Sequence, residues 1–98
     1  MFARVSTFEG APEHVDEQIR YAREQVLPAL EELEGFSGIL GLADRQSGKV
    51  LAVTLWESEQ AVRASEEAAN QLRDESAETA SETIAGVERY EVTFAELK

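Results

Sequence analysis

The stretch 43–58, ADRQSGKVLAVTLWES, predicts a hairpin turn, then a strand, then the start of a helix. Asp44 favours the first position of a type I turn, and Gly48 can supply the positive φ that follows it. The strand over 49–57 is apolar on both faces, so it is either central in a covered sheet or buried at an interface. Its faces are Leu51, Val53 and Leu55 on one side and Val50, Ala52, Thr54 and Trp56 on the other.

Apolar periodicity places further strands and helices around this hairpin. Six apolar residues between 15 and 33 recur at steps of three and four, which is typical of one helix face. Pro28 removes one backbone donor from that helix, so we expect a kink or a tightened last turn there, and Gly35 is a natural stop. The expected elements are a strand over 2–8, a helix over 12–33, strands over 36–43 and 49–57, a helix over 59–80 and a strand over 84–94.

The order β-α-β-β-α-β predicts a ferredoxin-like α+β fold within a single domain over 1–98. Right-handed crossovers place both helices on one face of a four-stranded antiparallel sheet. The opposite face would be bare, although the strand over 49–57 is apolar there. We therefore expect an identical subunit to cover it, giving a dimeric α+β barrel.

The net charge and the counts of cysteine and histidine exclude several classes of function. Twenty acidic residues against nine basic ones give a formal net charge of −11, which repels phosphate backbones and anionic lipids. We therefore expect neither nucleic acid nor a membrane as a partner. With no cysteine and only His14, thiolate sites and multi-histidine metal sites within one chain are excluded. The first ten residues do not resemble a signal peptide, so a cytoplasmic location is expected.

Two groups of polar residues fall on faces that are otherwise apolar. Arg4 and Ser6 share one side of the first strand with two phenylalanines. Either they line a core or pocket wall, or the arginine stem packs while its head reaches water. Ser65 and Ser76 interrupt the apolar residues on the inward face of the second helix. This indicates either that the helix lies close to the sheet or that a small-molecule pocket lies beneath it.

His14 and Tyr21 lie seven residues apart, so they share a helix face. That face is opposite the apolar stripe, and we interpret His14 as an outward-facing surface residue. An outward tyrosine can mark an interface, although scattered surface aromatics are common.

Four motifs resemble the dimeric α+β barrel superfamily, and within it small proteins of the antibiotic biosynthesis monooxygenase-like group. They are GFSG at 35–38, DRQSGK at 44–49, LWES at 55–58 and ERYEV at 88–92. The superfamily includes cofactor-independent oxygenases of aromatic polyketides, haem-degrading enzymes, small-molecule isomerases and members without known activity. Haem degradation is rejected, because the resemblance implies a histidine on the second helix and this chain has none there. The polyketide oxygenases use pocket Asn, Trp, Tyr and Arg residues.

Two hypotheses for function follow from this resemblance. The first is a cofactor-free monooxygenase acting on an electron-rich aromatic such as a hydroquinone, with Trp56 as a stacking wall between sheet and helices. The second is a non-catalytic dimer that binds a small apolar molecule or a partner, as in a stress response. No cofactor or metal is expected in either. The candidate pocket residues are Arg4, Trp56, Ser65, Asn70 and Arg73.

Overall fold

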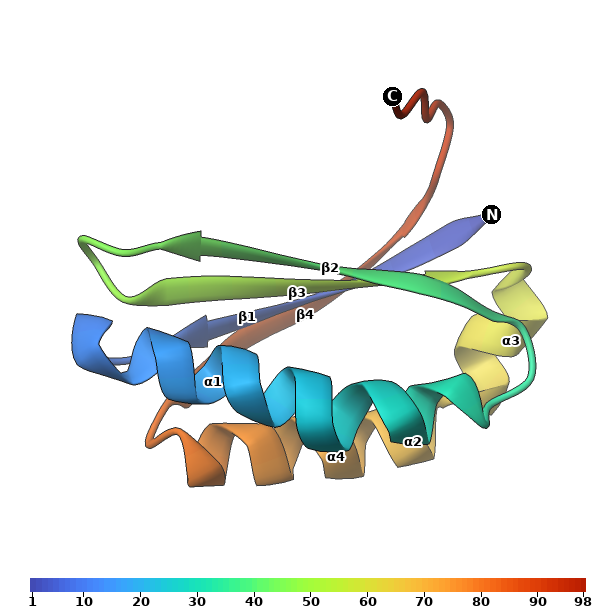
Figure 1. Ribbon diagram of the computed structural model, residues 1–98. Coiled ribbons are helices and arrows are strands. Elements are labelled where there is room, and N and C mark those ends of the chain that lie inside the picture. Colours follow the sequence, from blue (N-terminus) through green and yellow to red (C-terminus); the bar gives the residue numbers. More distant parts are fainter.

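The computed structural model describes residues 1–98 and contains a four-stranded antiparallel sheet with every helix on one side of it (Figure 1). The strand order β2-β3-β1-β4 places β3 and β1 in the centre. This is the ferredoxin-like α+β arrangement, so the predicted fold class is confirmed. The strands are β1 (Phe2–Glu9), β2 (Phe36–Asp44), β3 (Lys49–Trp56) and β4 (Thr83–Glu91).

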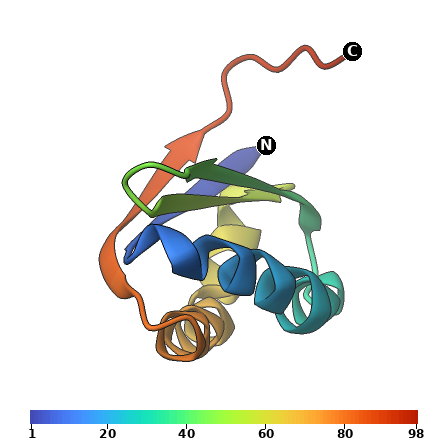
Figure 2. The same cartoon turned by 60° about the vertical axis from the view of Figure 1, so that its left-hand side comes forward.

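The helical layer consists of two long segments, which Figure 2 shows as separate rods under the sheet. The first joins η1 (Pro12–His14), α1 (Val15–Tyr21), η2 (Ala22–Val26) and α2 (Leu27–Glu31). The second joins α3 (Glu59–Ala64) and α4 (Glu66–Thr79), with a break at Ser65. The prediction of one uninterrupted helix over 59–80 is therefore wrong.

Pro28 affects the first helical segment on both sides. The tightened last turn is confirmed, because Leu33 N donates to Leu30 O at 2.9 Å, three residues back rather than four. Before the proline, η2 is a π-helical turn in which Leu27 N donates to Ala22 O. Because Pro28 has no backbone N–H, it cannot donate the hydrogen bond to the carbonyl four residues earlier that a regular helix would have. The π turn lies directly before this missing bond. The sequence did not predict this π turn.

The predicted hairpin turn and helix start are confirmed in detail. Asp44 Oδ1 accepts a hydrogen bond from Gln46 N at 2.9 Å, and Gly48 N donates to Asp44 O at 2.9 Å. Gly48 has φ of 86°, as the turn requires. Ser58 Oγ caps α3 by accepting from Ala61 N at 3.1 Å.

The buried apolar side chains form two clusters between the sheet and the helices. Trp56 is fully buried in the second cluster, where it meets Phe36 edge to face at 5.5 Å between ring centroids. Residues from both clusters face a space between them, which is described below. The clusters are Phe8, Val15, Val50 and Ala77, and Leu30, Trp56 and Val62.

Two further expectations are corrected. β4 ends at Glu91, so residues 92–94 are not part of the strand, and the chain beyond leaves the body on the side of the sheet away from the helices (Figure 1). His14 does not face outward into solvent. It is half-buried, and its Nδ1 is buried without a hydrogen-bond partner. It is close enough to Glu82 to act electrostatically on that carboxyl group, where it opposes the rise in pKa caused by burial.

Candidate functional site

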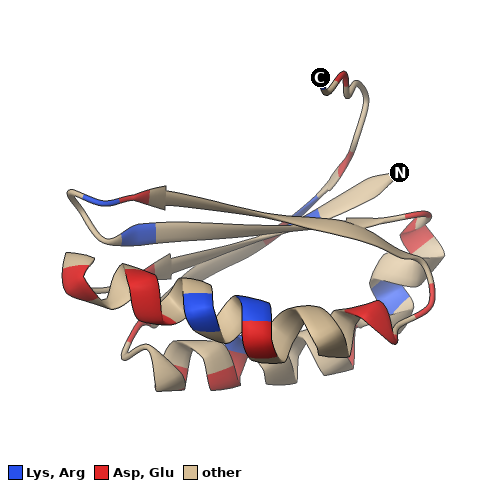
Figure 3. Cartoon of the chain, viewed as in Figure 1, with Lys and Arg blue, Asp and Glu red and all other residues tan.

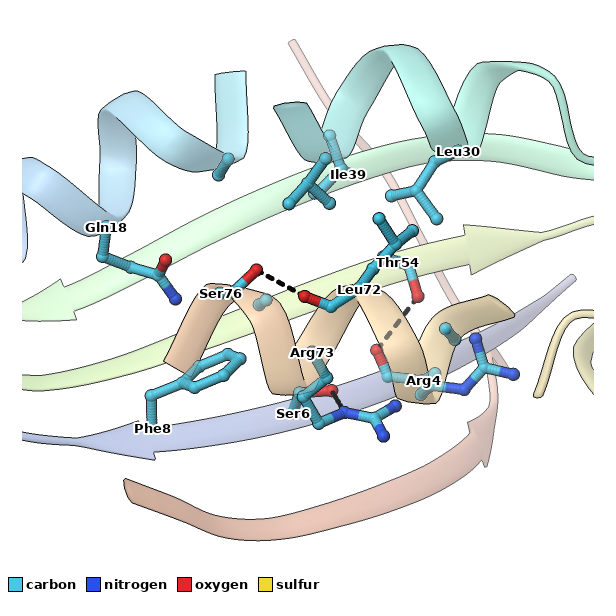
Figure 4. Close-up of a pocket in the computed structure, with 14 residues that line it drawn as sticks. Arg4, Ser6, Phe8, Gln18, Leu30, Ile39, Thr54, Leu72, Arg73 and Ser76 are labelled. Carbon is cyan, nitrogen blue, oxygen red and sulfur yellow. Dashed lines mark hydrogen bonds between the residues drawn. The ribbon is translucent and has the colours of Figure 1, made fainter. Parts of the chain in front are cut away.

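A small cavity lies between the sheet and the helical layer, bounded by β1, β2, β3, α1, α2, η2 and α4. Its volume is about 60 Å³, which suits water-sized molecules, since a cavity of roughly 150 Å³ is needed to hold benzene. Most of the lining is apolar, with Phe8 and Leu30 contributed by the two core clusters. Figure 4 shows Gln18 and Phe8 towards one end of this space and Thr54 and Arg4 towards the other.

Arg4 gives the cavity its most buried charge. Only 2% of this residue is exposed, so the expectation that its head reaches water is wrong. One guanidinium nitrogen, Nη2, donates to Val62 O at 2.7 Å and to Ser65 Oγ at 3.1 Å, and lies 3.2 Å from Glu66 Oε2. The other two nitrogens, Nε and Nη1, are buried and have no partner. Buried unpaired donors are costly, so these two nitrogens lower the stability gained from burying Arg4.

Arg73, on α4, is the second arginine of the lining and is 9% exposed. Its Nε donates to Ser6 Oγ at 2.9 Å (Figure 4). Its Nη1 donates to Asn70 Oδ1 at 2.6 Å. Both acceptors are neutral, and no carboxylate forms an ion pair with it. Burial, followed by the nearby Arg4 charge, lowers the pKa of Arg73 from its ordinary value.

Glu66 is the one carboxylate in contact with this group of arginines. Arg89 on β4 binds it through both Nε and Nη2, each at 2.6 Å, in the bidentate geometry typical of arginine and carboxylate. These hydrogen bonds lower the pKa of Glu66 from 4.5 to about 2 against the opposing effect of burial, with Arg4 adding to them. Glu66 is therefore ionised at neutral pH and accounts for one negative charge beside Arg4, Arg73 and Arg89.

Gln18 on α1 is a cavity residue that the sequence analysis missed. It is 4% exposed, and its Oε1 is buried without a partner. A signal was present, because Gln18 lies three residues after Val15 and four before Ala22 and so shares the inward face. The periodicity was read from apolar residues only, and a polar residue in the stripe was overlooked.

A wider groove of about 420 Å³ adjoins the cavity between the first helical segment and β2. Its volume lies within the usual range for small-molecule sites, and most of its lining is apolar. The π turn begins at Ala22, which lines both spaces, and such turns are frequent at functional sites. The residues common to cavity and groove are Gln18, Ala22, Ile39 and Ala52.

The structure brings two of the five predicted pocket residues, Arg4 and Arg73, to the cavity lining. Asn70 is exposed on α4 and accepts the hydrogen bond from Arg73. Ser65 is buried beside Arg4. Trp56 lies outside the lining, where its ring packs 5.4 Å from the Arg4 guanidinium and its Nε1 donates to Thr54 Oγ1 at 3.0 Å. Trp56 thus packs behind Arg4 and does not form the wall of this cavity.

The chemistry available in the cavity is narrow. Its polar lining residues are arginine, serine, threonine and glutamine, without an aspartate, glutamate, histidine, lysine or tyrosine. No group of three or more His, Cys, Asp or Glu side chains is placed to hold a metal ion. No helix is long and apolar enough to cross a bilayer. The cavity can therefore donate hydrogen bonds and positive charge, but no side chain in it has the basicity to remove a proton.

Solved structures with the same fold include oxygenases. A monooxygenase of Streptomyces coelicolor, solved with nanaomycin D, superposes with a TM-score of 0.75 over 99% of this chain and 91% of its own, at 23% identity. SnoaB, a cofactor-independent oxygenase of Streptomyces nogalater, gives 0.65 over 96% and 94%, at 15% identity. A dimeric ferredoxin-like protein from an uncultured marine organism gives 0.69 over the full length of both chains, at 9% identity. At these identities the likeness establishes the fold.

Relatives in sequence include two uncharacterised proteins of Mycobacterium tuberculosis. One is 43% identical over 77 residues, covering 79% of this chain and 33% of the relative. The other is 38% identical over 92 residues, covering 94% of this chain and 41% of the relative. This chain thus spans only a third to two-fifths of their length. The family model described as antibiotic biosynthesis monooxygenase matches residues 1–73, about three-quarters of the chain, and the chain belongs to that family.

Proposed function

We propose that the chain is a cofactor-independent monooxygenase acting on an aromatic, quinol-type small molecule. The observation that carries the proposal is the apolar groove that leads into a largely apolar cavity lined also by Arg4, Arg73 and Gln18, in a chain of this family. The aromatic ring would occupy the groove, and its oxygen-bearing edge would reach the cavity, which is too small for a ring.

The proposed reaction needs little chemistry from the protein. An electron-rich quinol or anthrone ionises to an anion that transfers electrons to dioxygen directly. One oxygen atom enters the substrate, the other leaves as water, and the substrate supplies both electrons. The protein contributes binding, orientation and exclusion of water, which the apolar lining of the groove and cavity favours.

Oxygen consumption with a panel of hydroquinones and anthrones tests this proposal. We expect uptake with at least one compound, and one labelled oxygen atom per product molecule under ¹⁸O₂. Ala52→Leu should fill the junction of cavity and groove and abolish uptake, whereas Ala64→Leu, exposed on α3, should not. Thermal unfolding shows whether both variants remain folded. No uptake with any compound, or equal uptake by both variants, would contradict the proposal.

A second candidate is a non-catalytic dimer that binds a small apolar or aromatic molecule. The observation in its favour is that no cavity residue could act as a general base, because the lining holds no aspartate, glutamate, histidine, lysine or tyrosine. Ligands that fit the groove would then raise the unfolding temperature without oxygen uptake. The same panel separates the two functions, because an oxygenase converts its ligand and a binding protein returns it unchanged.

We further propose that the open sheet face binds a second copy of the chain. Leu40, Leu42 and Tyr90 are each about half exposed on that face, at 49%, 50% and 51%. Leu51 and Val53 of the central strand β3 also point away from the helices, since Ala52 and Thr54 line the cavity. An apolar sheet face left open is an aggregation hazard, and a structural neighbour is described as dimeric.

The segment 92–98 supports the same partner, because it leaves the body on the open-face side (Figures 1 and 2). Phe94 and Leu97 in it are 81% and 85% exposed, so they gain cover only from another surface. Light scattering should give the mass of two chains, and Val53→Glu should give one. A wild-type protein that stays monomeric at micromolar concentration would contradict this assembly.

A further inference from the structure

Gly41 lies in the edge strand β2 at a position where nothing in the fold requires a glycine. Its φ is not positive, in contrast to that of Gly35 and Gly48. A Cβ built on Gly41 would meet no heavy atom within 4 Å beyond its chain neighbours, whereas one on Gly48 would lie 2.1 Å from Gly10 O. A glycine inside a strand is unfavourable, because it has no side chain to pack and loses much conformational freedom on folding. Neither backbone conformation nor packing therefore explains this residue.

The open space beside Gly41 is the groove between β2 and the first helical segment, which this residue lines. Gly41 pairs with Ala52 of β3 in the antiparallel register, so the two residues lie side by side on the face towards the helices. Gly41 is also exposed, so a ligand in the groove would contact its backbone directly. A strand glycine of this kind often marks the close approach of a ligand.

Small residues line the groove from both of its walls. Ala22 of η2 belongs to the helical wall, and Gly41 and Ala52 belong to the sheet wall. Larger apolar side chains border them, because Ile39 lies two residues before Gly41 and Val50 two residues before Ala52 on the same face of the sheet. The groove volume of about 420 Å³ is well above the roughly 150 Å³ that holds benzene, so more than one ring fits.

We propose that Gly41 is a specificity-determining residue, whose missing side chain admits an aromatic ligand of two or more fused rings to the groove. A branched side chain at this position would project into the space of the second ring, while a single ring would still fit beside it. This inference rests on the proposed function, since it concerns which aromatic molecules the groove accepts. It also accounts for a residue that is unfavourable in a strand, because such exceptions are expected where a protein binds its ligand.

Binding of 2-naphthol and phenol, measured by isothermal titration calorimetry without oxygen, tests the inference with a two-ring and a one-ring probe. The quantity to compare is the ratio of the two dissociation constants, which cancels any effect of a variant that is common to both probes. Gly41→Val should lower the preference for 2-naphthol by about tenfold or more, as expected when one ring is no longer buried. Its affinity for phenol should stay close to that of the wild type. Gly41→Ala should lower the preference by a smaller factor.

Stability gives a second measurement, because a glycine required by the fold and a glycine required by a ligand predict opposite results. Gly41→Ala and Gly41→Val should unfold at the wild-type temperature or above it, since the new Cβ meets nothing and valine favours a strand. Gly86→Val is the matched control. Gly86 lies in β4, outside the groove, and a Cβ there also meets nothing within 4 Å, so this variant should keep the wild-type preference for 2-naphthol.

Several results would overturn the inference. They are a loss of stability in Gly41→Ala, an unchanged preference in a folded Gly41→Val protein, an equal loss of preference in Gly86→Val, and no binding of 2-naphthol by the wild type. If Gly41→Val does not fold, the preference of Gly41→Ala decides in its place.

The result is distinguishable from that of the oxygenase test. A lowered preference in Gly41→Val without oxygen uptake by any quinol would support the role of Gly41 and refute the proposed reaction. Oxygen uptake with an unchanged preference would support the reaction and refute the role of Gly41.

Discussion

Replacing Trp56 with alanine should cost the domain a large part of its stability. The residue is fully buried, and a tryptophan side chain buries on the order of 200 Å². At about 25 cal/mol per Å² that area corresponds to about 5 kcal/mol, which agrees with the 3–5 kcal/mol or so seen for such truncations. Domains of this kind have only about 5–15 kcal/mol in total.

Urea unfolding monitored by far-ultraviolet circular dichroism measures this cost. Trp56 is the only tryptophan, so fluorescence cannot follow the variant. With a slope of about 2 kcal/mol per molar urea, a loss of about 4 kcal/mol shifts the midpoint by about 2 M. Chain concentration must be held constant, because a dimer is stabilised by mass action. Gln71→Ala, at an exposed position on α4, is the control and should change stability by less than about 0.5 kcal/mol.

A milder substitution at Trp56 separates its packing from any part in the site. Trp56→Phe removes the hydrogen bond to Thr54 and weakens the contact with Arg4, a loss of about 1–2 kcal/mol. Because Trp56 lies outside the cavity lining, this variant should still consume oxygen with any quinol that the wild-type protein oxidises. A loss below about 1.5 kcal/mol for Trp56→Ala would refute the claim that this ring is tightly packed. Loss of oxygen uptake in a stable Trp56→Phe protein would refute its supporting position.

Two further predictions concern the pH dependence of stability at Glu82 and the backbone conformation at Gly48. Burial raises the pKa of Glu82 above its ordinary value of 4.5, so its ionised form opposes folding and stability falls as pH rises through that raised value. Glu82→Gln should therefore raise the unfolding temperature at pH 7, with the gain disappearing below about pH 4; an equal gain at both pH values would disprove this cause. Gly48→Ala should destabilise by more than about 2 kcal/mol in urea, because φ is 86° and a Cβ would lie 2.1 Å from Gly10 O. Gly86→Ala meets nothing within 4 Å and serves as its control.

The fold was predictable where it depends on local chemistry. The turn needs a carboxylate at Asp44 and a positive φ at Gly48, and both are visible in the sequence. The strand over 49–57 alternates with a period of two, which assigns Ala52 and Thr54 to one face and Leu51 and Val53 to the other. Such signals need no knowledge of distant residues.

The break between α3 and α4 was not predictable, because its hydrogen bonds come from a distant strand. Val62 O accepts from Arg4 Nη2, 58 residues away in sequence, and also from Ser65 Oγ at 3.0 Å. In a continuous helix this oxygen would accept from the nitrogen of residue 66 instead. Helical periodicity reports which face is buried, but it does not report a tertiary donor that replaces a helical bond.

The site was predictable only in part for a related reason. Arg4 and Arg73 were identified because they are charged residues near apolar faces, and both line the cavity. Trp56 was predicted to be a stacking wall of the pocket, because strand alternation gives the face of a side chain but not what covers it. Phe36 and Arg4 cover the ring, and both contacts depend on strand register. The binding role of all five candidates remains a prediction.

The acidic residues of this chain act mainly on large polyanions. Figure 3 shows these residues spread along the helices and loops, and most of them are exposed. Salt screens such charges beyond about 8 Å at physiological ionic strength, so they act mainly on large polyanions that approach several of them together. The charges of Arg4 and Arg73 are buried and are screened much less. A nucleic acid or an anionic membrane would therefore meet mainly the acidic exterior, whereas the largely apolar lining of the groove and cavity favours a small apolar or aromatic molecule.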